Sequence, residues 1–372
     1  LIIGTYLALA LLFLAFRFLL LPNADSFRGE IESRLSAAAG AQVRIGHIAP
    51  DISSFWPRLR LENVSVRRPG DAAPALSVKT LEAQLDWSSV PLRKPVFLTL
   101  RLDSPRLSVL RTGESDLDIG GFRIDLSDPG ENAFTDWLLQ QGTVNVSNAR
   151  VEYEDRTREG FPRLALDTAG ITFSRSLGKW TAGMQGIASF GPESFPVDLR
   201  AEIGRTLLVR RSDWKTWSGK FYAAAAPRNV AEIAKLLHSG TSVAGGSGNA
   251  VIWADFSQGS VTNLVSDFRL SGLRYGKKAN LSAAGRLFGS RPEEGNLMRA
   301  AVPSLRISTS LLGEPLTVSV DASRSTDGNH EDDQLSVRIP SLDLKATAGA
   351  MEQALGKRFP DEIRKLSPSG IL

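Results

Sequence analysis

The first 21 residues of the chain are almost entirely apolar, with no acidic residue and a single base, Arg17. A helix needs about 20 such residues to cross a bilayer. A cleaved signal peptide has a shorter apolar core and a small-residue cleavage site, and Pro22-Asn23-Ala24-Asp25 is a poor one. We therefore expect an uncleaved single-pass anchor over residues 1–22. The side chains expected in the membrane are Leu9, Leu12, Phe13, Phe16 and Leu20.

Composition limits the compartment and the partners. The 372 residues include no cysteine, whereas a eukaryotic extracellular domain of this size usually carries disulfides. A bacterial envelope protein fits this composition, and so does a cytosolic one. The formal charge of +4 is small for the length, and charges of both signs are interspersed, so the sequence predicts no nucleic-acid partner.

Residues for catalysis or metal binding do not form a recognisable constellation. His47, His238 and His330 lie far apart in the sequence, and without cysteine a zinc site would need an unusual set of histidines and carboxylates. No spacing of serine, aspartate or glutamate suggests a nucleophile with its base or a pair of catalytic carboxylates. We expect no catalytic residue, no metal and no cofactor, and we do not expect an enzyme.

A short helix is expected directly after the anchor. Phe27, Ile31 and Leu35 fall on one helical stripe, and Gly40 lies where such a helix would end. The helix could close the end of a sheet or lie as a collar on the membrane surface. Both interpretations stay open at this stage.

From Val43 onwards the apolar residues recur at every second position. Leu81, Ala83 and Leu85 alternate with polar residues, for example, which is typical of a strand with one apolar and one wet face. Val64 and Val66 follow Leu59 and Leu61 in the opposite phase, which predicts a bulge or kink at Glu62-Asn63.

Few helices interrupt this pattern. We expect short ones near residues 132–141, 228–238 and 346–355, as end-plugs or edge covers, whereas an α/β fold would need a helix after nearly every strand. The sequence therefore predicts a mainly β protein built on a long, twisted antiparallel sheet.

The apolar face of such a sheet must be covered. A second sheet would make a sandwich, closure would make a barrel, and a half-pipe would leave a groove for an apolar ligand; periodicity alone does not separate these three. We predict that one shared apolar interior contains Leu81, Leu85, Leu98, Leu100, Leu102, Val144 and Val146.

The order of these segments resembles that of a known family. After the anchor and the Phe27-x-x-x-Ile31 helix come four strand-like stretches and a second module that opens with Phe134-x-x-Trp137-Leu138. The stretches are residues 51–59 (DISSFWPRL), 61–66 (LENVSV), 81–90 (LEAQLDWSSV) and 100–109 (LRLDSPRLSV). This order is similar to that of the N-terminal part of YhdP-type proteins of the AsmA-like superfamily, which are related to TamB. The resemblance covers nearly all of residues 1–260 and contains no catalytic signature.

The resemblance implies an architecture and a role. Proteins of this type are anchored in the Gram-negative inner membrane and cross the periplasm as an open hydrophobic β-groove, or β-taco. They are thought to pass phospholipid towards the outer membrane, with partner proteins at the inner and outer membranes. By this resemblance we expect the anchor at residues 1–22, a first periplasmic groove module at 23–125 and continuing modules at 126–372. The rival role is a scaffold that assists outer-membrane protein assembly without carrying lipid, by pairing sheet edges with client strands.

Overall fold

The computed structural model describes residues 14, 18, 22–51, 56, 58–86, 89, 96–125, 133–176, 178–205, 213–236, 243–275, 279–291, 297–310, 314–327, 330–341 and 343–355. The expected anchor residues Leu9, Leu12, Phe13, Phe16 and Leu20 lie outside these ranges. Within the ranges, no helix has both the length and the hydropathy needed to cross a bilayer.

The protein is mainly β, as the alternation predicts, and its strands belong to two compact units. Unit 1 comprises Leu1–Gly191 and Gly204–Trp214, and unit 2 comprises Pro192–Ile203 and Lys215–Leu372. The two compact units are defined by packing, whereas the boundary expected between residues 125 and 126 separates modules along the sequence. That boundary stays a prediction.

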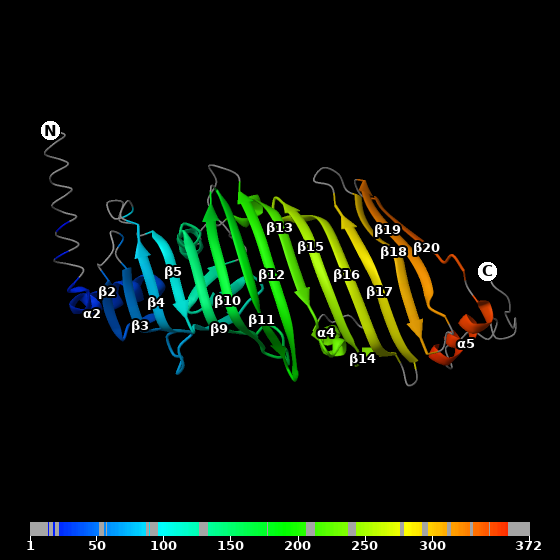
Figure 1. Ribbon diagram of the computed structural model, residues 1–372, viewed down its shortest axis with the longest axis horizontal. Helices are drawn as coiled ribbons and strands as arrows, with labels where there is room; N and C mark the ends of the chain where they lie inside the picture. Colours follow the sequence, from blue (N-terminus) through cyan, green and yellow to red (C-terminus); the bar gives the residue numbers. More distant parts are fainter. Residues whose placement is uncertain are drawn as a thin grey trace. The chain divides into compact units, whose positions relative to one another are not determined.

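Unit 1 contains eleven described strands, of which β2, β3, β4, β5, β9, β10 and β11 are labelled side by side in Figure 1. They are β1 (Gln42–Arg44), β2 (His47–Asp51), β3 (Arg58–Arg67), β4 (Leu76–Leu85), β5 (Phe97–Asp103), β6 (Arg106–Arg111), β7 (Asp116–Ile119), β8 (Phe122–Asp125), β9 (Thr143–Asp155), β10 (Leu164–Ser176) and β11 (Lys179–Phe190). Strands β1 and β2 both pair with β3, and the sheet continues through β4, then β5 and β6, then β9, β10 and β11.

The sheet of unit 1 is mixed, and the expectation of a purely antiparallel sheet is wrong here. Strands β5 and β6 both pair with β9 in parallel. Parallel neighbours need a crossover connection of about a dozen residues or more, and the segment between β6 and β9 supplies it. This segment contains the hairpin of β7 and β8 and the short helix α3 (Ala133–Leu138).

The strand pairings described in unit 2 are all antiparallel. Its elements are β12 (Glu193–Arg205), the 3-10 turn η5 (Trp214–Thr216), β13 (Trp217–Ala225), α4 (Val230–Leu236), β14 (Val243–Ala244), β15 (Ser247–Ser257), β16 (Ser260–Tyr275), β17 (Ala279–Ser290), β18 (Leu297–Thr309), β19 (Leu316–Asp327), β20 (His330–Arg338) and α5 (Leu344–Leu355). From β15 to β20 each strand pairs antiparallel with the next. The expected helices near 228–238 and 346–355 are therefore present as α4 and α5.

The helix expected after the anchor is α2 (Arg28–Ala39), which follows the 3-10 turn η2 (Ala24–Phe27). Gly40 ends it in the left-handed conformation, with φ of 63°, as glycine at that position predicts. Of the apolar stripe, Ile31 packs on the core of unit 1, whereas Phe27 and Leu35 are exposed. The packing of Ile31 confirms that this helix covers one end of the sheet.

Candidate functional site

Two rows of apolar side chains cross the sheet of unit 1 from strand to strand. Directly paired residues on neighbouring strands share a face, so the pairings trace each row. The first row contains Ile48, Leu61, Leu81, Leu102, Val146, Ile171 and Met184. The second contains Leu59, Ala83, Leu100, Val144, Phe173 and Ala182. We call the face that carries these rows the apolar face of unit 1.

The predicted interior residues are found in or beside these rows. Leu81, Leu100, Leu102, Val144 and Val146 belong to them directly. Their alignment on one face was predicted from strand phase alone, whereas a role in lining a lipid path stays a prediction. Of the predicted set, the two most buried are the leucines at 85 and 100, at 7% and 6% exposure.

The remaining predicted residues, Leu85 and Leu98, lie at an irregularity. Leu85 pairs with Phe97, while Gln84 pairs with Thr99, so Leu98 has no direct partner on β4. The register shift between Gln84 and Leu85 is a β-bulge. Strand alternation alone could not show this bulge, because it depends on the pairing of β4 with β5.

The opposite face of the same strands is polar. Between the two apolar rows lies a row of Arg60, Glu82, Arg101, Asn145 and Thr172. Arg60 lies 3.9 Å from Glu82 across the strands, and a hollow of about 360 Å³ beside this row is lined mainly by polar residues, among them Thr80 and Ser147. The sheet of unit 1 therefore has one apolar and one polar face across at least five strands.

A line of backbone irregularities crosses the sheet at a single level. Asn63 lies opposite Lys79, because its neighbours Glu62 and Val64 pair with Thr80 and Val78. By the same register Ser104 and Asn148 continue the line on the next strands. Asn63, Ser104 and Asn148 have positive φ, at 53°, 50° and 54°, which is rare for residues other than glycine. We call this line the crease.

The crease explains why β3, the β5–β6 junction and β9 change their apolar phase there. One extra left-handed residue reverses the alternation, so residues on both sides of the line can present apolar groups to the same face. Val64 and Val78 lie beyond the crease and form one buried cluster with Ile45 and Ile48. Leu61, Leu81 and Leu102 pack on that cluster from the other side of the line. The predicted kink at Glu62-Asn63 is thereby confirmed as one part of a longer feature.

Hydrogen bonds around Asp103 join two strands at the crease. The Ser147 hydroxyl and the Asn148 amide donate to its Oδ1, at 3.0 and 3.3 Å. These bonds, that from Ser147 first, lower the pKa of Asp103 below its usual value. The backbone N–H of Ser104 also donates to the Ser147 carbonyl, at 2.9 Å. Strand β9 is therefore fastened to the β5–β6 junction where both strands are irregular.

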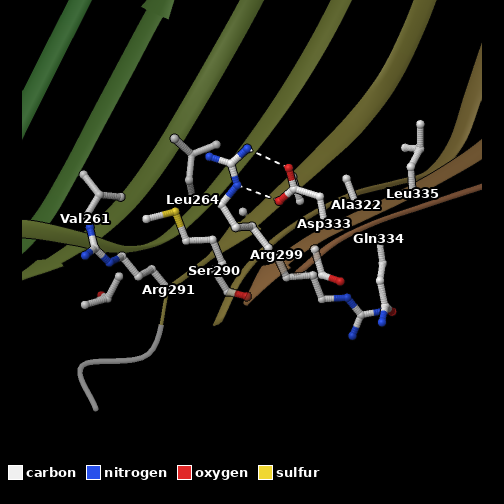
Figure 2. A pocket seen from close by; sticks show the side chains of 15 residues that line it. Val261, Leu264, Ser290, Arg291, Arg299, Ala322, Asp333, Gln334 and Leu335 are labelled. Atoms are coloured by element: carbon white, nitrogen blue, oxygen red, sulfur yellow. Dashed lines mark hydrogen bonds and ion pairs between the residues drawn. The ribbon is translucent and has the colours of Figure 1, made fainter. Parts of the chain in front are cut away.

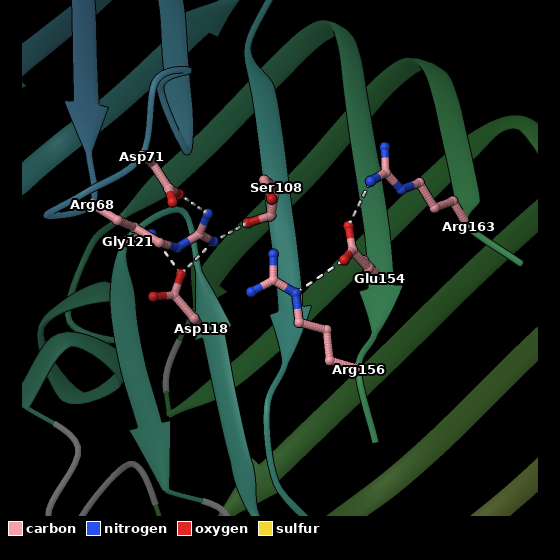
Figure 3. Close-up of polar contacts among 8 residues, drawn as sticks. All are labelled: Arg68, Asp71, Ser108, Asp118, Gly121, Glu154, Arg156 and Arg163. Carbon is pink, nitrogen blue, oxygen red and sulfur yellow. Dashed lines mark hydrogen bonds and ion pairs between the residues drawn. The ribbon is translucent and has the colours of Figure 1, made fainter. Parts of the chain in front are cut away.

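The hairpin of β7 and β8 covers part of the apolar face beyond the crease. A Cβ at Gly121 would lie 3.2 Å from a methyl of Val66 and 3.6 Å from Ala41. Figure 3 shows how the hairpin is fixed: Arg68 donates to Asp118 and to the Ser108 carbonyl, while Asp118 accepts the Gly121 N–H. These contacts hold the hairpin on the sheet as a cover that strand alternation alone does not predict.

Helix α3 and the residues that follow it, up to Gln141, cover the other end of the strands. Trp137 contacts Phe97 edge-on, with ring centroids 6.4 Å apart, and the Trp180 indole N–H donates to the Leu139 carbonyl at 3.1 Å. Gln141 is fully buried and accepts the Phe97 N–H at 2.8 Å. The helix expected near 132–141 therefore covers the strand ends around Phe97 and Trp180.

Unit 2 repeats the two-faced pattern with less cover. One row of its sheet contains Ala223, Ile252, Ser266, Leu287, Val302, Val320 and Val337. At one end, Val230 of α4 packs on this face beside Gly248 and Leu270. Among the described residues of unit 2 the buried apolar side chains are Ala231, Ala254, Leu273 and Val318. Most of this face is therefore only partly shielded from water.

Within the described ranges, little supports a metal site or a set of free charged groups. No group of three or more histidine, aspartate or glutamate side chains there could hold a metal ion. Charged groups are mostly paired: Glu154, for example, accepts from Arg156 and Arg163, each at 3.0 Å, as Figure 3 shows. The bond from Arg156 is the main reason that the pKa of Glu154 is lowered.

Comparison with known proteins gives one clear result. The family model described as YhdP protein matches residues 1–372. A search of curated proteins finds no match.

Proposed function

Because the chain belongs to the YhdP family, we propose that it carries phospholipid acyl chains along its apolar sheet faces, from an anchor in the inner membrane towards the outer membrane. The observation that carries the proposal is the pair of apolar rows in unit 1, which run unbroken across six strands from β3 to β11. In this proposal the periplasm holds the bulk of the chain, and partner proteins meet it at the two membranes.

The energetics favour such a surface. Exposing an acyl chain to water costs about 0.8 kcal/mol per CH₂ group, so a chain of about sixteen carbons costs on the order of 12 kcal/mol. A continuous apolar surface removes most of that cost, and it requires no nucleophile, metal or cofactor. The protein then acts as a carrier surface and not as an enzyme.

Partial burial of the rows supports an accessible surface. Leu102, Val144 and Val146 are only partly buried, whereas the central residues of a closed sandwich core are usually shielded from water completely. The polar row through Arg101 and Asn145 lies on the other face of the same strands. A lipid chain could therefore contact one face while the other face stays in water.

Crosslinking to lipid tests the proposal with a matched pair of positions. A photoreactive amino acid at Val146 should form adducts with phospholipid when the full chain is expressed in its membrane. The same amino acid at Asn145, the adjacent residue on the opposite face, should form few. Mass spectrometry of the purified protein identifies the adduct, and equal labelling at both positions would contradict the proposal.

The second candidate function is a scaffold that assists outer-membrane protein assembly. Strand β20 favours it, because its residues Leu335 and Val337 are exposed, and exposed sheet edges can pair with other strands. Crosslinks from Val337 to a client protein, without lipid adducts at Val146, would favour the scaffold.

A further inference from the structure

The apolar face of unit 2 has a hollow near one end of its strands. Five cross-strand neighbours form its floor, in the order Leu264, Gly289, Ala300, Ala322 and Leu335. The three central residues are the smallest ones available, and a Cβ at Gly289 would meet only Leu264, at 3.5 Å. Small side chains between two leucines leave space that a larger side chain would fill.

This hollow is part of a cavity of about 600 Å³, whose lining residues are drawn in Figure 2. Small-molecule sites in proteins span about 300–1,000 Å³, so the cavity has the volume for a ligand. Apolar side chains at its margin are unusually exposed: Val261 at 51%, Met298 at 44% and Leu335 at 72%. An apolar ligand would remove this surface from water.

The charges around the cavity are unequal. Arg324 makes a two-pronged pair with Asp333, at 2.7 and 2.8 Å, drawn with dashed lines in Figure 2. Arg299 is paired in the same way with Asp321. Each of these two charges is neutralised, and Asp333, the only acid among the described lining residues, is already engaged.

Arg291 is the exception. Its backbone N–H donates to the Thr262 carbonyl at 2.7 Å, which fixes the start of the side chain at the cavity margin. Its guanidinium has no ion pair or hydrogen bond with any residue that the structure describes. Among the residues that the structure describes, the cavity therefore combines an apolar floor with one arginine, Arg291, that has no ion-pair partner.

We propose that this cavity binds the phosphate headgroup of a lipid at Arg291, with the adjoining acyl chain lying over the floor between Leu264 and Leu335. The proposal rests on the proposed lipid-carrying function and adds a place where the headgroup is held. A guanidinium donates charge-assisted hydrogen bonds to phosphate. A free inorganic phosphate would leave the apolar floor exposed, and an uncharged amphiphile would leave Arg291 without a partner.

A competition experiment tests this assignment on the full chain held in an amphipol. A photoreactive amino acid at Met298 is crosslinked to radiolabelled dodecyl phosphate, and the labelled fraction at increasing concentration gives an apparent Kd. Unlabelled dodecyl phosphate should compete well, dodecanol should compete less well, and inorganic phosphate should not compete. Equal competition by dodecanol, or full competition by inorganic phosphate, would overturn the assignment.

Three variants separate the contributions to binding. Arg291→Gln should weaken dodecyl phosphate binding about fivefold to tenfold, since one charge-assisted contact is lost at an exposed site. Arg306→Gln on the opposite face of β18 is the matched control and should leave the apparent Kd unchanged. Gly289→Leu fills the hollow from a position without backbone strain and should reduce labelling whatever the headgroup.

Failure of this proposal can be told apart from failure of the proposed function. If lipid adducts form at Val146 but Arg291→Gln and Arg306→Gln bind dodecyl phosphate equally, the headgroup site is wrong and lipid carriage stands. If no lipid adduct forms at Val146, the proposed function fails independently of the result at Met298. Circular dichroism of each variant confirms that binding is compared between folded proteins.

Discussion

Arg68 on the loop after β3 and Asp118 on β7 form an ion pair at which both side chains are largely buried, at 15% and 12% exposure. The Asp118 Oδ1 that accepts from Arg68 also accepts the Gly121 N–H, at 2.8 Å. The Asp118 carboxylate therefore attaches the hairpin of β7 and β8 to the sheet through Arg68. It also stabilises the turn of that hairpin through the Gly121 N–H. The hydrogen bond that Arg68 donates to Asp118 raises the pKa of Arg68, which keeps the guanidinium charged.

Loss of this carboxylate should release the hairpin from the sheet. We expect Asp118→Ala to destabilise unit 1 by about 2–3 kcal/mol, because Arg68 is left partly buried without its partner. Since the natural chain has no cysteine, a single cysteine at Leu107, beneath the hairpin, reports on its position. Maleimide labelling of Leu107→Cys should accelerate in the Asp118→Ala background.

The double variant Arg68→Met with Asp118→Leu is the control for this result. Replacing both charges by apolar groups of similar size is often close to neutral. Labelling that stays slow in the single variant would show that the ion pair does not hold the hairpin.

Charge on the apolar face should have different effects at two neighbouring positions. Leu100 is 6% exposed, so an aspartate there is buried without a partner and should cost about 3 kcal/mol or more. Val146 is only partly buried, so Val146→Asp should fold and lose co-purified lipid. Lipid extracted from each purified variant, measured together with its urea midpoint, checks both expectations.

Leu85→Arg is the companion of Leu100→Asp, because Leu85 is equally buried. Loss of fold at these two positions is therefore expected and does not by itself indicate a closed core. Unfolding of Val146→Asp would indicate that the whole face is a closed core, and the lipid path would then be contradicted.

Much of unit 1 can be predicted from the sequence, because the alternation of apolar and polar residues along a strand is a local signal. Alternation located Leu81, Leu100, Leu102, Val144 and Val146 on a common face, since strand phase alone decides which side a residue faces. It did not predict the parallel pairing of β9. Two strands more than forty residues apart carry no local signal of their direction relative to each other, and the hairpin between them looks like any other hairpin.

The crease was partly visible in the sequence. The phase change at Asn63 was recognised, and the same change follows Leu102 at Ser104 and Val146 at Asn148. Treated one strand at a time, these changes look like separate irregularities. Only the register of neighbouring strands shows that they form one line.

The cavity of unit 2 is even harder to predict from the sequence, because its floor forms only when neighbouring strands pair in the right register. Gly289, Ala300 and Ala322 lie on three different strands, and nothing in their spacing predicts that they meet. In the sequence, nothing distinguishes Arg291 from the other arginines. Its position beside an apolar hollow follows from the pairing of β17, β18 and β19, which strand periodicity does not contain.

Backbone conformation at the crease makes a separate prediction. Asn63 has φ of 53°, a region that glycine tolerates and β-branched residues do not. We expect Asn63→Val to lower the free energy of unfolding by about 1–2 kcal/mol relative to Asn63→Gly. Urea unfolding of the two variants measures this difference, and equal stabilities would show that the left-handed conformation is not needed for the fold.

Acid should destabilise unit 1 through Asp155. This carboxyl is almost fully buried, at 2% exposure, and the Thr157 hydroxyl and backbone N–H both donate to it. The hydroxyl bond is the main reason that the pKa of Asp155 is lowered in the folded protein. A carboxyl whose folded pKa is lowered stabilises the fold above its unfolded pKa of about 3.9, and this stabilisation is lost as the pH falls through the folded pKa.

The free energy of unfolding should therefore fall steeply below about pH 4 in the natural protein. In Asp155→Asn that part of the pH dependence should disappear, while the variant should be less stable near neutral pH because Arg111 and Arg158, each 3.8 Å from the carboxylate, lose their partner. Glu114→Gln, at an exposed carboxyl on the loop before β7, is the matched control. Urea unfolding at a series of pH values measures the slopes. If Asp155→Asn and the natural protein lose stability in parallel below about pH 4, another carboxyl is responsible for the acid sensitivity.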